Sequence, residues 1–222
     1  MTATTTAALT PLDAERNFVF DAIRAGGIAV AYQPVASRRA DGSWLVTGVE
    51  ALMRPTTPAL GWSTETFLRA CARFDALGEL FLHVLDEGLA RIREWDAIGL
   101  ELRLAVNLHA GALAEPAIGR DVAAALARHG LPGERLLLEL GEGAAIDDFD
   151  RADLSISCLR ALGVRIAIDD FGAGLGSLTR LDVVDCDEIK IDRSLVTGLE
   201  RSAELRRACA SAVAQGHARC LK

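Results

Sequence analysis

Short apolar runs alternate with longer amphipathic segments along this chain, and turn-forming residues separate them. The first amphipathic segment predicts a helix over residues 11–25. Two apolar runs that meet at Asp41-Gly42 follow it and predict a β-hairpin over residues 28–34 and 44–52. The N-terminal quarter of the chain is therefore expected to contain one helix and two paired strands.

After the hairpin, helical and strand patterns take turns. Apolar side chains recur at helical spacing in the long segments, and short runs rich in leucine, valine and isoleucine lie between them. The pattern predicts helices over residues 64–99 with a break near Gly78, 116–129, 148–162, 178–181 and 201–215, and strands over residues 102–108, 136–140, 164–168, 188–191 and, as a beginning only, 218–221. This alternation indicates right-handed βαβ crossovers and a parallel sheet covered by helices.

Length and strand count together favour a barrel. A chain of 222 residues is long enough for one α/β barrel domain. Six complete strands and the start of a seventh fall short of the eight strands of a TIM barrel. We therefore expect an α/β fold of the TIM (β/α)8 type, truncated after about six and a half strands. Residues 1–11 would be a flexible N-terminus, and residues 12–222 one domain that is incomplete at its C-terminus.

Composition narrows the classes of function. A net charge of −7 argues against a surface for DNA or RNA polymers. The N-terminal residues lack a secretory signal pattern, and no apolar run approaches the roughly 18 residues of a membrane segment. The five cysteines form no Cys-x-x-Cys pair, as expected of reduced thiols in a cytoplasmic protein. Only Lys190 and Lys222 are lysines among 24 lysine and arginine residues, so a lysine here needs a reason beyond its charge.

Polar side chains gather where five of the predicted strands end. In chain order they are Glu50, Asn107, Glu139, the pair Asp169-Asp170, and Lys190. The carboxyl ends of barrel strands share one rim, so we expect these side chains to converge. Carboxylates so close together would repel each other, and Mg²⁺ or Mn²⁺ ions, which prefer oxygen ligands, would relieve that repulsion. Two such ions suit hydrolysis at phosphorus, with Lys190 as a fixed cation beside the attacking water or the phosphate.

Four of these residues also have a structural explanation. Asp169 and Asp170 can form a solvated turn after a strand, and Asn107 can satisfy its amide through a core hydrogen bond. Lys190 can form a salt bridge to Asp169 or Asp192. The scarcity of lysine favours a functional role for Lys190, whereas Asn107 taken alone favours the structural one.

Five ordered motifs resemble those of the EAL domain, the bacterial phosphodiesterase that hydrolyses cyclic di-GMP to linear pGpG. They are Glu50-Ala51-Leu52 with Arg54, Asn107-Leu108, Glu139-Leu140-Gly141-Glu142, Asp169-Asp170-Phe171-Gly172, and Lys190-Ile191-Asp192-Arg193. The resemblance covers about residue 12 to the end of the chain. It implies a modified (β/α)8 barrel with one antiparallel strand and a role in cyclic di-GMP signalling.

The resemblance also implies a role for each motif residue. Metal ligation falls to Glu50, Asn107, Glu139, Asp169 and Asp170, and catalysis to Lys190 at the attacking water together with Glu50 and Asp169. Gln33 and Arg54 would contact the dinucleotide, and Glu142 would anchor the loop after Asp170. The implied cofactor is a pair of Mg²⁺ or Mn²⁺ ions, with the second site incomplete in this chain.

Departures from the family pattern keep other functions open. Gly141 stands where the family usually has Thr, His109 where it has Ser, and Leu175-Gly176 where it has an aromatic residue and Ser. Family members also continue into a strand with a Glu-Gly-Val-Glu motif. The alternative is a catalytically inactive domain that binds cyclic di-GMP or a partner protein. An enolase-type proton abstractor is disfavoured, because the ordered motifs match the phosphodiesterase at every carboxylate. A homodimer and an attached sensory domain both stay open.

Overall fold

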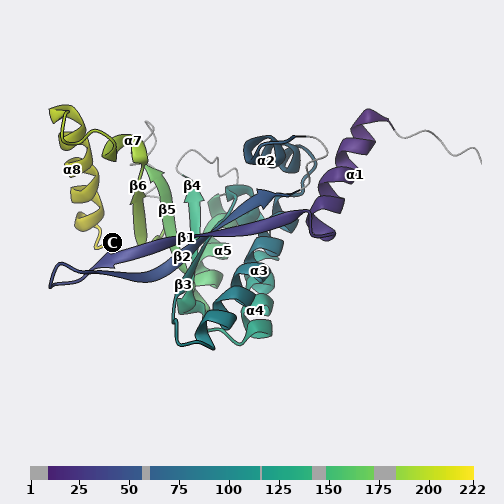
Figure 1. Ribbon diagram of the computed structural model, residues 1–222, viewed down its shortest axis with the longest axis horizontal. Helices are drawn as coiled ribbons and strands as arrows, with labels where there is room; N and C mark the ends of the chain where they lie inside the picture. Colours follow the sequence, from purple (N-terminus) through teal and green to yellow (C-terminus); the bar gives the residue numbers. More distant parts are fainter. Residues whose placement is uncertain (1–9, 57–60, 116, 142–148, 173–183) are drawn as a thin grey trace, which may run out of the picture.

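The computed structural model describes residues 10–56, 61–115, 117–141, 149–172 and 184–222 (Figure 1). The helices are α1 (Pro11–Arg24), α2 (Thr64–Arg73), α3 (Leu77–Asp96), α4 (Ile118–His129), α5 (Phe149–Ala161), α7 (Arg193–Val196) and α8 (Ala203–Ala218), with 3₁₀ turns η2 (Ala110–Ala114) and η3 (Gly133–Arg135). The strands are β1 (Ile28–Arg38), β2 (Trp44–Pro55), β3 (Arg103–Asn107), β4 (Leu136–Gly141), β5 (Arg165–Phe171) and β6 (Glu188–Ile191). These elements confirm the alternation read from the sequence, while the helix expected at 178–181 lies outside the described residues.

One curled sheet organises the molecule. Within the described residues its strand order is β1-β2-β3-β4-β5-β6, with β1 antiparallel to β2 and every later pair parallel. Neighbouring strands lie about 4.8 Å apart, so β2 and β6 would be about 19 Å apart in a flat sheet. A contact of 3.0 Å between the Lys190 ammonium on β6 and Glu50 on β2 therefore requires the sheet to curl into part of a barrel. The α/β fold of the TIM type is confirmed.

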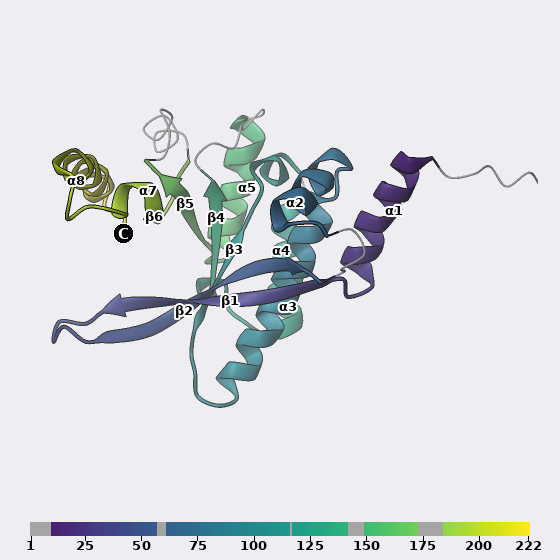
Figure 2. The same ribbon diagram turned by 45° about the horizontal axis from the view of Figure 1, so that its top comes forward.

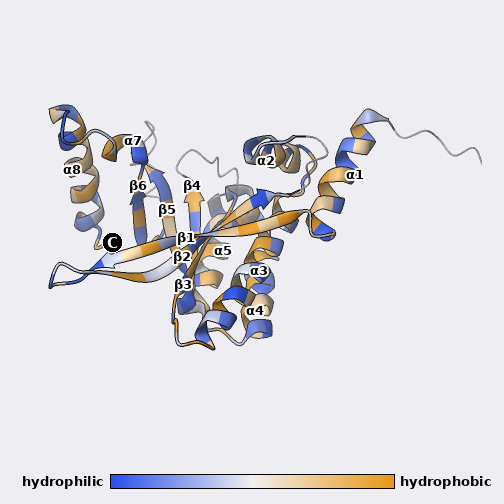
Figure 3. Ribbon diagram, in the orientation of Figure 1, coloured by the Kyte–Doolittle hydropathy of each residue, from blue (hydrophilic) through white to orange (hydrophobic). Residues whose placement is uncertain are grey.

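Helices cover the convex face of this sheet. Alternate residues of β2, namely Val49, Ala51 and Met53, are buried in the same core as α3. Turns of α3 and α4 alternate between hydrophobic and hydrophilic colouring in Figure 3, as expected of helices with one apolar face. Helix α3 approaches the sheet closely at Gly88, where an added Cβ would lie 2.8 Å from the Leu104 side chain. Glycine at this point lets α3 settle directly on β3.

The concave face carries three layers of side chains. At the amino ends of the strands Glu188 accepts hydrogen bonds from Arg103 and Arg165, at 2.8 and 3.1 Å. A small apolar layer follows, formed by Ala105, Leu137 and Ala167. The third layer, at the carboxyl ends, is the cluster of acids predicted from the sequence. Because side chains alternate across each strand, residues two apart on one strand point to the same face of the sheet.

The β1–β2 hairpin is longer than predicted and extends well past the other strands (Figure 2). Its register pairs Gln33 with Glu50 and shifts between Val35 and Ala36, as at a β-bulge. Beyond the shift the strands carry exposed apolar side chains, of which Trp44 is 68% exposed. The sequence shows where the hairpin turns but not how far its strands stay paired.

The strand predicted at 218–221 is wrong. Helix α8 continues to Ala218, because residues 215–218 keep helical hydrogen bonding where the sequence pattern suggested an end. Only the last residue joins the sheet. The amide of Lys222 donates to the Asp187 carbonyl at 3.2 Å, and its carbonyl accepts from the Ile189 amide at 2.9 Å. This is the hydrogen-bond pattern of a parallel bridge beside β6.

Candidate active site

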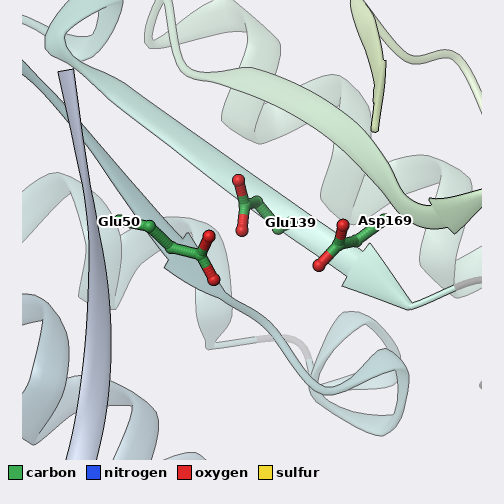
Figure 4. Close-up of side chains that lie close together, drawn as sticks. All are labelled: Glu50, Glu139 and Asp169. Atoms are coloured by element: carbon green, nitrogen blue, oxygen red, sulfur yellow. The ribbon is translucent and has the colours of Figure 1, made fainter. Parts of the chain in front are cut away.

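Three carboxylates from three strands meet at the carboxyl end of the sheet. Glu50 of β2, Glu139 of β4 and Asp169 of β5 each place one oxygen within 4.8 Å of the others. Figure 4 shows the three side chains close together. Parallel register explains the convergence, since Gly141 pairs with Asp169 and Glu139 pairs with Asn107. Leu138 and Leu140 flank Glu139 and face the helices, so alternation turns the glutamate to the concave side.

Asn107 and Lys190 complete the cluster. The Asn107 amide nitrogen donates to Glu50 Oε1 at 3.0 Å. The Lys190 ammonium lies 2.8 Å from Glu139 Oε2, 3.0 Å from Glu50 Oε2 and 3.4 Å from Asp169 Oδ1. The salt bridge considered for Lys190 from the sequence is thus present, and it reaches three carboxylates at once.

Burial gives these groups unusual proton affinities. Glu139 is 2% exposed, and this desolvation raises its pKa to about 7, against the opposing charge of Lys190. Burial alone would lower the pKa of Lys190, but the charge and hydrogen bond of Glu139, followed by the charge of Asp169, raise it above its ordinary value. Lys190 therefore keeps its positive charge at neutral pH.

Asp170 lies outside the group of three carboxylates. It sits at the register shift between Ile168 and Phe171 with φ of 55°, and its side chain is exposed. Partial desolvation of the carboxyl, followed by the charges of Asp169 and Asp192 and a hydrogen bond with Asp192, raises its pKa. Asp170 has a left-handed backbone conformation and its side chain interacts with Asp192 instead of the three carboxylates. The role of Asp170 as a metal ligand therefore stays a prediction.

A cavity of about 620 Å³ opens beside the cluster. Glu50, Asn107 and Glu139 line one end of it. Its walls are largely apolar and come from α2, α3 and the end of β2: Leu52, Met53, Leu68, Ala72, Leu77, Leu80, Phe81 and Val84. The volume and the mixture of apolar walls with a few polar groups are typical of small-molecule sites. The sequence did not separate these wall residues from core residues, because both occur at the same helical spacing.

Of the two residues expected to touch a dinucleotide, Arg54 lines this cavity and Gln33 lies on the neighbouring strand. Arg54 is exposed, lines the cavity and donates to the Met53 carbonyl at 2.8 Å. Gln33 is exposed and lies opposite Glu50 in the hairpin register, so both side chains occupy the same face. Gly141 and His109, two departures from the family pattern, also line the cavity. Glu142 lies outside the described residues, and its role as a loop anchor stays a prediction.

The donor set fits a divalent cation with a preference for oxygen. Three carboxylate oxygens converge. The Asn107 side chain now donates its amide nitrogen to Glu50, and a 180° flip of the amide would present its oxygen to an ion instead. Within the described residues, no histidine or cysteine belongs to this group. Mg²⁺ or Mn²⁺ therefore suits the site better than Zn²⁺.

Comparison with known proteins decides the family. The sequence profile of the EAL domain matches residues 16–222. The chain belongs to the EAL domain family. This EAL domain is 35% identical to the bifunctional diguanylate cyclase/cyclic di-GMP phosphodiesterase MucR of Pseudomonas aeruginosa over 79% of the chain. It is 32% identical to the cyclic di-GMP phosphodiesterase RocR of the same organism over 82% of the chain. The resemblance inferred from the five motifs is confirmed.

Solved structures give the same answer. The c-di-GMP complex of the PaMucR phosphodiesterase superposes on this EAL domain with a TM-score of 0.81 and 31% identity, covering 94% of this chain and 84% of that one. The matched region is 26% of the length of MucR and 47% of the length of RocR. The chain thus spans less than half of these curated relatives. Among the described residues no helix combines the length and apolarity that a membrane span needs.

Proposed function

We propose that this EAL domain hydrolyses cyclic di-GMP to linear pGpG in a reaction that depends on Mg²⁺ or Mn²⁺. The observation that carries the proposal is the convergence of Glu50, Glu139, Asp169 and Lys190 at one end of a 620 Å³ cavity. Relatives named as cyclic di-GMP phosphodiesterases support the choice of substrate. Hydrolysis joins a water oxygen to phosphorus and breaks the bond to one ribose 3′ oxygen, which opens the ring to pGpG.

Glu50, Asn107, Glu139 and Asp169 would hold the first ion, and Asp170 would contribute to a second. When bound, such ions lower the pKa of an attached water and neutralise charge on the phosphate. Lys190 would place a positive charge beside the water or the phosphate oxygens. Arg54 and Gln33 would orient the dinucleotide at the mouth of the cavity. The apolar wall of the cavity would exclude water from one guanine base of the dinucleotide.

The test is conversion of cyclic di-GMP to pGpG, followed by chromatography with Mn²⁺ or Mg²⁺ present. Glu50→Gln and Lys190→Met are expected to lower kcat at least about 100-fold. Lys222→Met is the matched control, since Lys222 is the other lysine and is exposed outside the cavity. Turnover that survives both site substitutions would refute these roles. Tight binding without product, unchanged by chelators, would favour a cyclic di-GMP receptor instead.

Two further expectations remain proposals. The first is a cytoplasmic location, which would agree with five cysteines in the reduced state. An attached sensory domain or a homodimer would provide regulation, and the larger size of MucR and RocR is compatible with further domains.

A further inference from the structure

The Lys190 ammonium contacts the same carboxylate oxygens that a divalent ion would need as ligands. Its contacts at 2.8, 3.0 and 3.4 Å go to Glu139, Glu50 and Asp169. These are the three carboxylates whose oxygens lie within 4.8 Å of one another. A monovalent ammonium and a divalent ion thus draw on one set of ligands, and both cannot keep all of their contacts.

The cluster needs a cation even without a metal. Three carboxylates within hydrogen-bonding distance of one point repel each other, and that repulsion is strong where water is excluded. Glu139 is 2% exposed, so solvent cannot screen it. Within the described residues, every ion pair recorded for these three carboxylates is made by Lys190.

The position of Lys190 suits a cation that can leave. Its side chain is 32% exposed, whereas that of Glu139 is 1% exposed. Strand β6, which carries it, is four residues long and partly exposed throughout. The flexible stem of lysine can carry its ammonium a few ångströms toward solvent without any movement of the strand.

We propose that Lys190 is an internal counter-ion, which holds the three carboxylates together in the metal-free protein and releases them when a divalent ion binds. Lys190 then stabilises the metal-free fold and weakens metal affinity by competition. The ammonium that leaves the carboxylates stays beside the ion, where the proposed function requires a positive charge. The inference rests on that function only for the choice of Mg²⁺ and Mn²⁺ as probes.

Lys190→Met tests the competition, because methionine keeps an unbranched stem and removes the charge. Lys222→Met is the control, since it removes the same charge from an exposed residue whose recorded contacts are made by its backbone. Both variants shift the net charge equally, so general electrostatic attraction of the metal cancels between them. Mn²⁺ binding is measured from the electron paramagnetic resonance signal of the free ion, without any dinucleotide.

Lys190→Met is expected to bind Mn²⁺ roughly tenfold more tightly than Lys222→Met. In EDTA it is expected to melt at least about 3 °C below Lys222→Met, and saturating Mn²⁺ should narrow this gap. Equal or weaker Mn²⁺ affinity in Lys190→Met would overturn the proposal, as would equal melting temperatures of the two variants in EDTA.

A second measurement uses the unsubstituted protein, in case Lys190→Met does not fold. Labelling with ¹⁵N-lysine gives two side-chain ammonium positions, and the spectrum of Lys222→Met assigns them. Added Mg²⁺ is expected to move the Lys190 resonance and leave that of Lys222 in place. A Lys190 resonance that stays fixed while calorimetry shows Mg²⁺ saturation would overturn the proposal. Both outcomes are independent of turnover, so failure to hydrolyse cyclic di-GMP would refute the proposed function alone.

Discussion

Removing the charge of Glu188 should destabilise the protein far more than the same change at a surface ion pair. Glu188 accepts hydrogen bonds from Arg103 at 2.8 Å and from Arg165 at 3.1 Å, across the concave face. Its side chain is 15% exposed, and those of the two arginines are 28% and 37% exposed. Both bonds end on Oε1, so the amide oxygen of Glu188→Gln can still accept them, but both guanidinium groups lose their charged partner.

The magnitude follows from the number of bonds and their exposure. A hydrogen bond to a charged group contributes about 1.5–3 kcal/mol. Two such bonds weaken in Glu188→Gln, and solvent screening at the half-exposed Arg165 reduces its share. We therefore expect a loss of about 2–3 kcal/mol in the free energy of unfolding, which lowers the melting temperature by roughly 5–10 °C in a chain of this length.

Glu65→Gln is the matched control for this prediction. Glu65 pairs with Arg69 at 2.9 Å, nearly the same distance, but the two side chains are 78% and 73% exposed. Exposed pairs of this kind contribute little, so its melting temperature should stay within about 1–2 °C of that of the unsubstituted protein. Thermal unfolding by circular dichroism in EDTA measures both variants. Similar small shifts in both would refute the reasoning that burial sets the strength of the Glu188 pairs.

Two further predictions concern packing and thiol chemistry. In Gly133→Ala the added Cβ would clash with the backbone carbonyl oxygen of Leu162, so the backbone must move. We expect the free energy of unfolding, measured by urea denaturation, to fall by about 3 kcal/mol or more. Burial raises the pKa of Cys71 to about 12 and that of Cys186 to about 11, so both thiols should stay protonated at pH 8 and react with iodoacetamide only after unfolding. The exposed Cys158 should react in the folded protein, and equal rates at all cysteines would contradict this.

The sequence predicted the converging residues because parallel strands restrict where their ends can lie. Asn107, Glu139 and Lys190 each lie near the carboxyl end of their strand, and Glu50 lies near the carboxyl end of the part of β2 that pairs with β3. The same argument fails for Asp170, whose direction depends on a positive φ at a register shift. Local backbone geometry of this kind has no signature in the spacing of apolar residues.

Contacts between residues far apart in the sequence were the least predictable part. The ion pairs of Glu188 with Arg103 and Arg165 are invisible to periodicity, because all three residues fall within strands that read as apolar runs. The bridge between Lys222 and β6 depends on where α8 ends, and its helical pattern does not mark that point. The apolar wall of the cavity likewise shares its helical spacing with the core.

The concave face explains how a strand that is partly exposed throughout can position a reactive side chain. All four residues of β6 are partly exposed, and Ile189 and Ile191 pack against the hydrophobic core. The other two, Glu188 and Lys190, form ion pairs with β2, β3, β4 and β5 on the concave face. Glu188 can therefore hold β6 in register while Lys190 exchanges partners. If that division is correct, Glu188→Gln should lower stability without removing the Mn²⁺ competition that Lys190 provides, and loss of both together would show that the two ion clusters act as one unit.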